Sequence, residues 1–528
     1  MKISYILLFV GLFIAFSGCE TYLEEEPFNT VDPETLFRDG PGALAAVNAT
    51  YKMMSRNQDS YGRDFLFVSE EPTETVTTRR DASDDRGRLD NWLWDKSHGF
   101  LAPVWTEAYA VINAANGVIE NVPLIEGMDP VLRARIVGEA KFLRAFNYFV
   151  LVRMWGGVPI REQQIKGVSE VLELPRSPAA EVYQLIIGDL QDAEAVLPTR
   201  EGYSAFAGVN TGRATQGAAR ALLAKVYLQK GATPAVSEGG EFVESLNYAN
   251  QVISEGNYEL VEDYRGIFDI NSENSAEVIF DIQQTSVENL GGDLSGHVVP
   301  RNSGLGRRSW GNFHAEVPFF NEYAATDQRT GSFILEYVAD GDTITYDANN
   351  FADDGYVTDG PGFFKLAELD PSIGANAQER PNKVLLRYAD VLLMAAEAAN
   401  EINNGPTAEA YNYVNQVRQR AGVPDLSPGL NYDQFRDSLL TERRKELIFE
   451  YHGWFDGLRF WDLFTDRVLA NVQTREAKIQ AGEWPDGNDA APRFFTSANI
   501  KDDKYRLFPI PQNVIDLNPK LEQNPGWE

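Results

Sequence analysis

The chain has 528 residues, of which 43% are hydrophobic and 12% aromatic, so it can bury a large core. Its 78 acidic and 47 basic side chains give a formal net charge of -31. Because a phosphate backbone is bound by a cationic surface, this charge argues against nucleic acid as a partner.

The N-terminus has the features of a secretory signal that ends at a cysteine. Lys2 precedes an apolar run over residues 6–16, which is too short to span a bilayer. Ser17 and Gly18 then precede Cys19, the only cysteine of the chain, so an internal disulfide is excluded. Small residues before a cysteine resemble a bacterial lipobox, in which the mature chain begins at an acylated thiol. We therefore predict a signal peptide over residues 1–18, a lipid anchor at Cys19 and an acidic tether over 19–30.

A single domain is expected from residue 31 to 528. Its first helix starts near Asp32-Pro33-Glu34, and its apolar residues recur at helical spacing as far as Tyr51, with an interruption at Gly40-Pro41-Gly42. The region 61–100 has no clean period and is rich in Thr, Asp, Arg, Gly and Trp. We interpret it as a long functional loop.

Helical pairs dominate the rest of the chain. Apolar periodicity predicts helices over 104–122 and 130–155, over 178–197, 213–230 and 241–255, and over 388–403 and 407–421. Small residues such as Ala395 and Ala399 would allow close helix contact. We predict an all-α, degenerate tetratricopeptide-like helical superhelix, with its scaffold at about 104–255 and 386–465. An ordinary helical array would show much the same periodicity.

Two segments depart from this helical pattern. The insertion at about 256–383 contains one probable strand, residues 277–282, among loops rich in Gly, Asn and Asp. The tail over 505–528 contains several prolines, so we expect it to lie extended or turned against the body.

The stretch from Glu442 to Leu463 reads as two helices joined at a corner. In the second helix, Trp454 and Trp461 fall on one face, and Asp456 and Arg459 are three residues apart and can pair. This composition favours a packing corner. Catalytic use of the acidic row at positions 442, 446 and 450 is the alternative.

These segments together resemble the SusD/RagB family of surface lipoproteins. The resemblance rests on the lipobox, the N-terminal helix, the helix from Trp105 to Asn116, the Glu442–Leu463 signature and the tail from Phe508 to Pro519. Phe16 departs from the leucine usual in a lipobox. The resemblance implies a non-catalytic protein on the outer membrane, which captures oligosaccharides and acts as the lid of a SusC-like TonB-dependent transporter. RagB-like members imply a peptide ligand as an alternative.

No motif indicates a catalytic metal or a nucleophile. The four histidines show neither zinc-protease spacing nor a neighbouring nucleophile motif. A glycoside hydrolase needs only two carboxylates, so it remains the enzyme alternative. No cofactor is predicted, although Asp340-Gly341-Asp342 and Asp353-Asp354-Gly355 are possible calcium loops that complete no EF-hand pattern.

Two loop regions, Thr78 to Asp95 and Arg301 to Phe313, carry the residues expected to bind a sugar. Aromatic rings stack on the C–H face of a sugar, and Arg, Asn and Asp bond its hydroxyls. The resemblance places the family's glycan platform in the same two regions. The predicted ligand-binding residues are Arg80, Asp81, Trp92, Trp94, Arg307, Arg308, Trp310 and Asn312. Each tryptophan has a core role as its alternative, and Trp310 is favoured because small and polar residues flank it. The arginines suggest an anionic glycan, unless they pair with nearby aspartates.

Overall fold

The structure is a computed structural model. It describes residues 36–528 except 56–59, 79–84, 166, 168–169, 171, 288–290, 293, 307, 340, 347–359, 371–378 and 482–499. The predicted signal peptide, the anchor at Cys19, the tether, Arg80, Asp81 and Arg307 lie outside the described residues. So do Asp340 and the second of the two proposed calcium loops.

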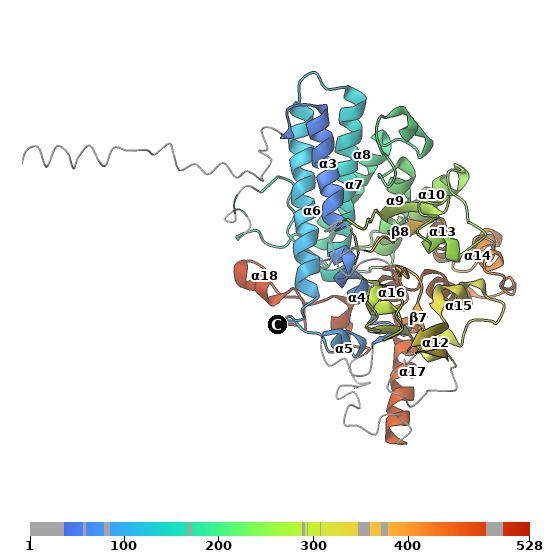
Figure 1. Ribbon diagram of the computed structural model, residues 1–528. Helices are drawn as coiled ribbons and strands as arrows, with labels where there is room; N and C mark the ends of the chain where they lie inside the picture. The colour runs from blue at the N-terminus through green and yellow to red at the C-terminus, as the bar shows by residue number, and fades with distance from the viewer. Residues whose placement is uncertain are drawn as a thin grey trace, which may run out of the picture.

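The scaffold is a series of antiparallel helices, each packed on the one before it (Figure 1). Its members are α3 (Gly40–Met54), α6 (Leu101–Asn121), α7 (Pro130–Trp155), α8 (Ala179–Val196), α9 (Gln216–Gly231), α10 (Glu241–Ser254), α13 (Tyr388–Asn403) and α14 (Ala408–Arg420). From α6 onward these bounds lie within a few residues of the predicted ones. The predicted start of the first helix near Asp32 lies outside the described residues, and Gly40-Pro41-Gly42, where an interruption was predicted, forms the first turn of α3. The arrangement confirms the all-α, tetratricopeptide-like fold class.

The ends and contacts of these helices follow from local chemistry. Asp129 caps α7 by accepting a hydrogen bond from the Leu132 N–H, and Pro130 occupies the first turn, where its missing N–H costs nothing. Gly156 ends the helix in a backbone conformation with φ of 71°. At Gly138 a Cβ would lie 2.6 Å from Val196, so only glycine lets α7 and α8 approach this closely.

The region 61–100 is not the long loop that its composition suggested. It contains η1 (Ser60–Gly62), α4 (Asp64–Glu70), β1 (Val76–Thr78) and α5 (Asp85–Asp90). All seven residues of α4 are buried. A helix buried on every side has no polar face, so its sequence shows no amphipathic period.

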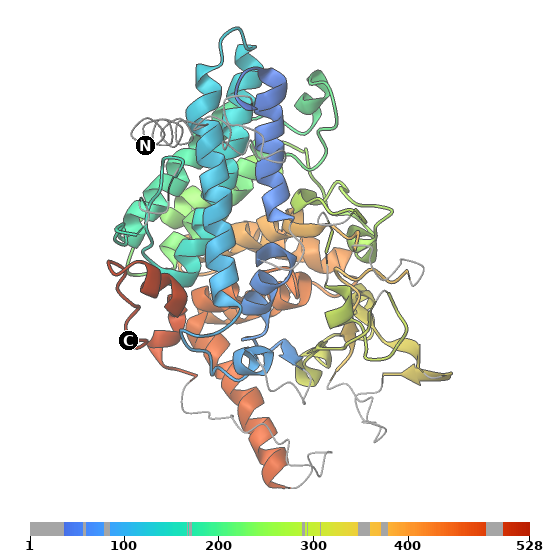
Figure 2. The ribbon, with the colours of Figure 1, turned by 60° about the vertical axis from the view of Figure 1, so that its left-hand side comes forward.

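Short strands hold the insertion to the scaffold. The predicted strand is present as β2 (Val278–Ile282), which pairs antiparallel with β8 (Lys383–Arg387). The described insertion also contains α11 (Ser295–Val298), β3 (Phe313–Ala315), α12 (Val317–Phe320), β4 (Phe333–Ile334), β5 (Glu336–Ala339), β6 (Asp342–Thr345) and β7 (Gly362–Phe363). The β5–β6 hairpin reaches outward from the body (Figure 2, yellow).

The signature corner, which we define as residues 442–463, contains three helices rather than two. They are α15 (Tyr432–Leu447), α16 (Gly453–Arg459) and α17 (Trp461–Gln480). The second predicted helix is divided at Phe460, and the link after α15 holds Phe449 and Tyr451 at φ of 61° and 68°. Aromatic rings of the corner pack against one another, against Trp92 and against Phe508 of the tail. In the tail, the short helices η7 (Asp503–Arg506) and α18 (Gln512–Leu517) interrupt the extended chain that was expected.

The acidic row of the signature is buried and paired with arginines. Arg387 donates to Glu277, Glu446 and Glu450 at 2.7, 2.6 and 2.7 Å. Burial alone would raise the pKa of Glu446, but the neighbouring guanidinium groups outweigh it and lower that pKa to about 2. Glu442 accepts from Arg329 at 2.6 Å. These carboxylates therefore hold α15 to the insertion, and the row is ion-paired as its composition indicated.

Candidate functional site

The two loop regions predicted to form the site meet at a strand pair. β1 and β3 are antiparallel, with Thr77 opposite His314 and Thr78 opposite Phe313. The end of β1 at Thr78 therefore lies beside the end of the loop that carries Trp310. Asp90 fixes this end of β1 by accepting hydrogen bonds from the backbone N–H and the hydroxyl of Thr78 at 3.3 and 3.1 Å.

Trp310 is a partly exposed ring on a loop that is bonded to α11. Its backbone N–H donates to the Gly296 carbonyl at 2.7 Å, and its side chain is 36% exposed. A Cβ on Gly296 would lie 3.0 Å from the indole, so the ring rests directly on the α11 backbone. The His297 ring meets the indole edge-on at a centroid distance of 4.8 Å. The indole is thus held in place on one side and open to solvent on another.

A cation lies beside this ring. The Arg308 guanidinium is 5.0 Å from the centroid of Trp310, within cation–π range, and the Arg308 side chain is exposed. Arg301 is half-buried in the same loop, where its backbone N would lie 2.6 Å from a Cβ added at Gly311. The described part of the loop therefore presents an aromatic face and positive charge together.

Asn312 lies inside the loop, which differs from its predicted role as a ligand contact. It is 4% exposed, and its amide nitrogen is 2.7 Å from His297 Nδ1. Its backbone N–H also donates to the His297 carbonyl at 2.7 Å. Asn312 thus orients the histidine on which Trp310 packs, and its side chain faces away from solvent.

Trp92 and Trp94 belong to the core, so for both of them the core alternative is the correct one. Each is 2% exposed. The Trp92 indole donates to the Pro72 carbonyl at 3.0 Å and packs 5.3 Å from the Trp454 ring, and Trp94 packs 5.7 Å from Trp454. The Trp92 backbone is left-handed, with φ of 53°, which turns the chain inward after α5. Neither ring is available to stack on a sugar.

The positive charge near the first loop is partly neutralised, as the pairing alternative expected. Arg88 donates to Asp85 at 3.0 Å and to Asp95 at 2.6 Å.

Two residues that support Trp310, Phe67 and His297, were not predicted from the sequence. Phe67 on α4 packs 5.2 Å from His297 and 4.4 Å from Phe313, so it lies behind the loop that carries Trp310. These residues are more than 200 positions apart, and only the β1–β3 register could have indicated their contact.

Among the described residues, no cluster of three or more His, Cys, Asp or Glu side chains is arranged to hold a metal ion. In the same part of the chain, no helix has the length and apolar character that a membrane span requires.

Comparisons with known proteins decide the family. The model of the SusD family matches residues 300–527, and a second model, described as starch-binding associating with outer membrane, matches residues 21–228. SusD-like protein P2 of Formosa agariphila is 30% identical over 551 residues, covering 99% of this chain and all of the relative. The chain belongs to the SusD family.

Other members agree over nearly the whole length of this SusD-family chain. The starch-binding protein SusD of Bacteroides thetaiotaomicron is 24% identical and is aligned over its full length. Among solved structures, a SusD homolog from Bacteroides thetaiotaomicron has a TM-score of 0.79 at 24% identity, covering 94% of this chain and 98% of the other. A surface glycan-binding protein A from Bacteroides uniformis has a TM-score of 0.71 at 21% identity, covering 92% and 99%. These structural likenesses concern the fold.

Proposed function

We propose that this SusD-family protein is a non-catalytic surface lipoprotein that binds an oligosaccharide or polysaccharide through the face of Trp310. The observation that carries the proposal is an indole that is 36% exposed, seated on Gly296 and accompanied by the Arg308 guanidinium. A ring held in one orientation stacks on a sugar without first losing rotational freedom, which favours binding. The names of the starch-binding and glycan-binding relatives support this ligand class.

The ligand passes from this surface to a membrane transporter. We propose that Cys19 is acylated, that the tether holds the domain outside the outer membrane, and that the domain closes as a lid over a SusC-like TonB-dependent transporter. The signal-like N-terminus and the family model described as associating with outer membrane support this location. Tagged full-length protein purified from its own outer membranes is expected to retain such a transporter. Repeated purification without one would contradict the role as a lid.

Affinity electrophoresis tests the proposed ligand surface. Wild type, Trp310→Ala and Trp310→Phe would be run through gels containing starch, xylan, laminarin, alginate or polygalacturonate. We expect retardation by at least one polymer, its loss in Trp310→Ala and its partial return in Trp310→Phe, because phenylalanine keeps a stacking face. Retardation that is equal in wild type and Trp310→Ala would contradict the assignment of the site.

The same gels distinguish neutral from anionic ligands. Arg308→Ala should weaken retention by alginate or polygalacturonate if the guanidinium binds a carboxylate. Lys520→Ala is the matched control, since it removes one exposed positive charge from the tail. Equal effects of the two variants would show that Arg308 contributes only general charge.

A further inference from the structure

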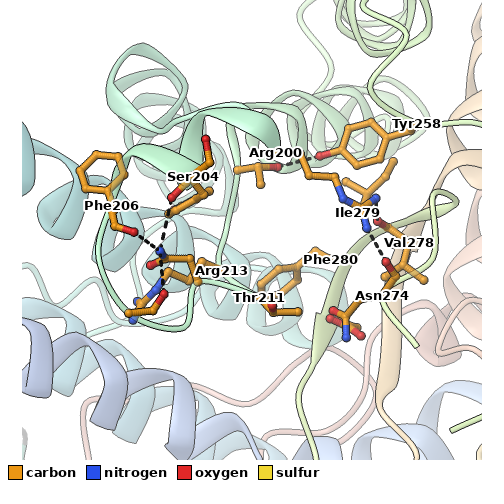
Figure 3. A pocket seen from close by; sticks show the side chains of 16 residues that line it. Arg200, Ser204, Phe206, Thr211, Arg213, Tyr258, Asn274, Val278, Ile279 and Phe280 are labelled. Carbon is orange, nitrogen blue, oxygen red and sulfur yellow. Dashed lines mark hydrogen bonds between the residues drawn. The ribbon is translucent and has the colours of Figure 1, made fainter. Parts of the chain in front are cut away.

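A cavity lies on the scaffold, away from the loop that carries Trp310. It has a volume of about 570 Å³ and is lined by residues of the segment 200–215, by Tyr258 and Asn274, and by residues 278–281. Figure 3 shows Arg200, Ser204 and Tyr258 on one side of an open space, and Thr211 and Phe280 on the other. This volume is within the range of roughly 300–1,000 Å³ that is usual for small-ligand sites.

A neighbouring hollow of about 380 Å³ lies between β2 and the end of α3. The two share five lining residues, which are Thr211, Gly212, Arg213, Phe280 and Asp281. Gly212, with φ of 80°, lies at this junction, and a Cβ there would be 2.3 Å from the Gln283 side chain. We call these two adjacent cavities the scaffold groove. None of the described residues from 299 to 312 lines it.

The charges of the larger cavity balance one another. The Arg213 guanidinium is paired with the buried Glu139 at 2.7 Å. Asp281 is 3% exposed, and the hydrogen bonds to its two oxygens come from the neutral amides of Gln283 and Asn382. Burial raises the pKa of Asp281 to about 6, while the amides of Asn382 and Gln283 and the charge of Arg200 oppose that rise. In the larger cavity Asp281 stands against Arg200, so its lining favours neither an anion nor a cation. The smaller cavity adds the exposed Lys52 at its border.

Two residues that border the smaller cavity, Gln284 and Arg213, carry buried polar atoms without partners among the described residues. The amide oxygen and nitrogen of Gln284 are both buried and have no hydrogen-bond partner among the described residues. Arg213 Nε is also buried and unbonded there. Burying such atoms without partners costs free energy, so a ligand that both donates and accepts hydrogen bonds is favoured. Hydroxyl groups do both.

The β2 side of the groove is not open to an added peptide strand. The Arg200 guanidinium already donates to the backbone carbonyls of Asn274 and Ser275, just before β2, and to that of Val278 at the start of β2, where a new strand would need acceptors. We therefore propose that the scaffold groove is a second ligand site, independent of Trp310, that takes a neutral polyhydroxylated ligand, namely a sugar or a short neutral oligosaccharide.

Saturation-transfer NMR on the full mature chain tests this site. The probes are glucose, galactose, mannose, xylose and arabinose, and the background is Trp310→Ala, so that the surface proposed above does not contribute. We expect transfer to at least one sugar. Adding Thr211→Trp, which fills the junction from an exposed position, should abolish it, whereas Ser254→Trp at the exposed end of α10 should leave it unchanged.

Gln284→Leu provides a second test, because a purely structural role of Gln284 would predict no change in sugar affinity. Because leucine removes two unpaired polar atoms, this variant should keep or gain thermal stability while its sugar affinity falls by about three- to tenfold. Absence of transfer to every probe, transfer that survives Thr211→Trp, or displacement of the sugar by a neutral tripeptide would each overturn the proposal.

The two sites can fail separately. Thr211→Trp in an otherwise wild-type chain should retain its polysaccharide retardation, which depends on Trp310. If that retardation fails in wild type while transfer to a sugar responds to Thr211→Trp, the groove stands and the Trp310 proposal is wrong.

Discussion

Replacing Trp461 by alanine should destabilise the protein without directly touching the proposed ligand surface. The indole is 6% exposed and lies 6.0 Å from the Trp92 ring and 6.2 Å from the rings of Trp454 and Phe464. The Arg506 guanidinium covers it at 4.6 Å. These contacts join the signature corner to the loop after α5 and to the tail.

The magnitude follows from what the truncation leaves behind. A buried indole removes roughly 150–250 Å² from water, which at about 25 cal/mol per Å² corresponds to about 4–6 kcal/mol as an upper estimate. Measured truncations of large aromatic residues cost about 3–5 kcal/mol. The neighbouring rings are rigid and cannot collapse into the space, so we expect about 3–5 kcal/mol for Trp461→Ala.

Urea unfolding followed by far-UV circular dichroism measures this loss. Fluorescence is unsuitable because the chain has nine tryptophans and the substitution changes one of them directly. Leu517→Ala, at a residue 66% exposed on α18, is the control and should change stability by less than about 0.5 kcal/mol. A loss below about 1 kcal/mol for Trp461→Ala would refute the buttress role. Full stability with lost glycan retention would move the binding site to the corner.

Three further predictions concern other parts of the chain. Arg387→Met leaves three buried carboxylates without their shared cation and should cost about 3–5 kcal/mol by the same urea assay, whereas Arg467→Met, which breaks a surface pair with Asp437, should cost less than about 1 kcal/mol. Burial raises the pKa of Glu70 to about 8, above its unfolded value of about 4.3. The bound proton therefore stabilises the fold fully at low pH, and this contribution is lost as the pH rises to about 8. Glu70→Gln should flatten the pH dependence of the free energy of unfolding between about pH 5 and 8, and an unchanged slope would contradict this. Cys19→Ser should abolish incorporation of labelled palmitate and release the protein from the membrane fraction, and retained label would place the anchor elsewhere.

The helical scaffold could be predicted because its pattern is local. Apolar spacing located α6, α7 and α13 to within a few residues, and caps such as Asp129 and Gly156 are recognisable one residue at a time. Short-range patterns failed where burial is complete. α4 has no polar face to mark it as a helix, and the corner breaks at Phe460 for reasons of packing that the spacing of its aromatic residues does not contain.

The candidate site was only partly predictable, because exposure is a property of the assembled molecule. Trp92 and Trp310 both follow polar sequence that looks flexible. Trp92 is nevertheless buried by residues such as Tyr505 from the far end of the chain, whereas Trp310 is partly exposed. The 413 positions between Trp92 and its hydrogen-bond partner Tyr505 carry no local signal. Small and polar neighbours distinguished Trp310 in the sequence, whereas its support by Gly296, fourteen positions earlier, appears only in the structure.

The signature corner and the ligand loop are connected through α4. At its end, Glu70 accepts hydrogen bonds from the backbone N–H groups of Phe449, His452 and Gly453, where the link after α15 takes its left-handed turns. One turn earlier, Phe67 packs on His297, which in turn supports Trp310. The buried helix α4, seven residues long, thus connects the signature corner to the loop that carries Trp310. Under the function proposed above, substitutions in the corner should therefore affect glycan binding by way of stability, while substitutions in the loop around Trp310 should change which glycan is bound.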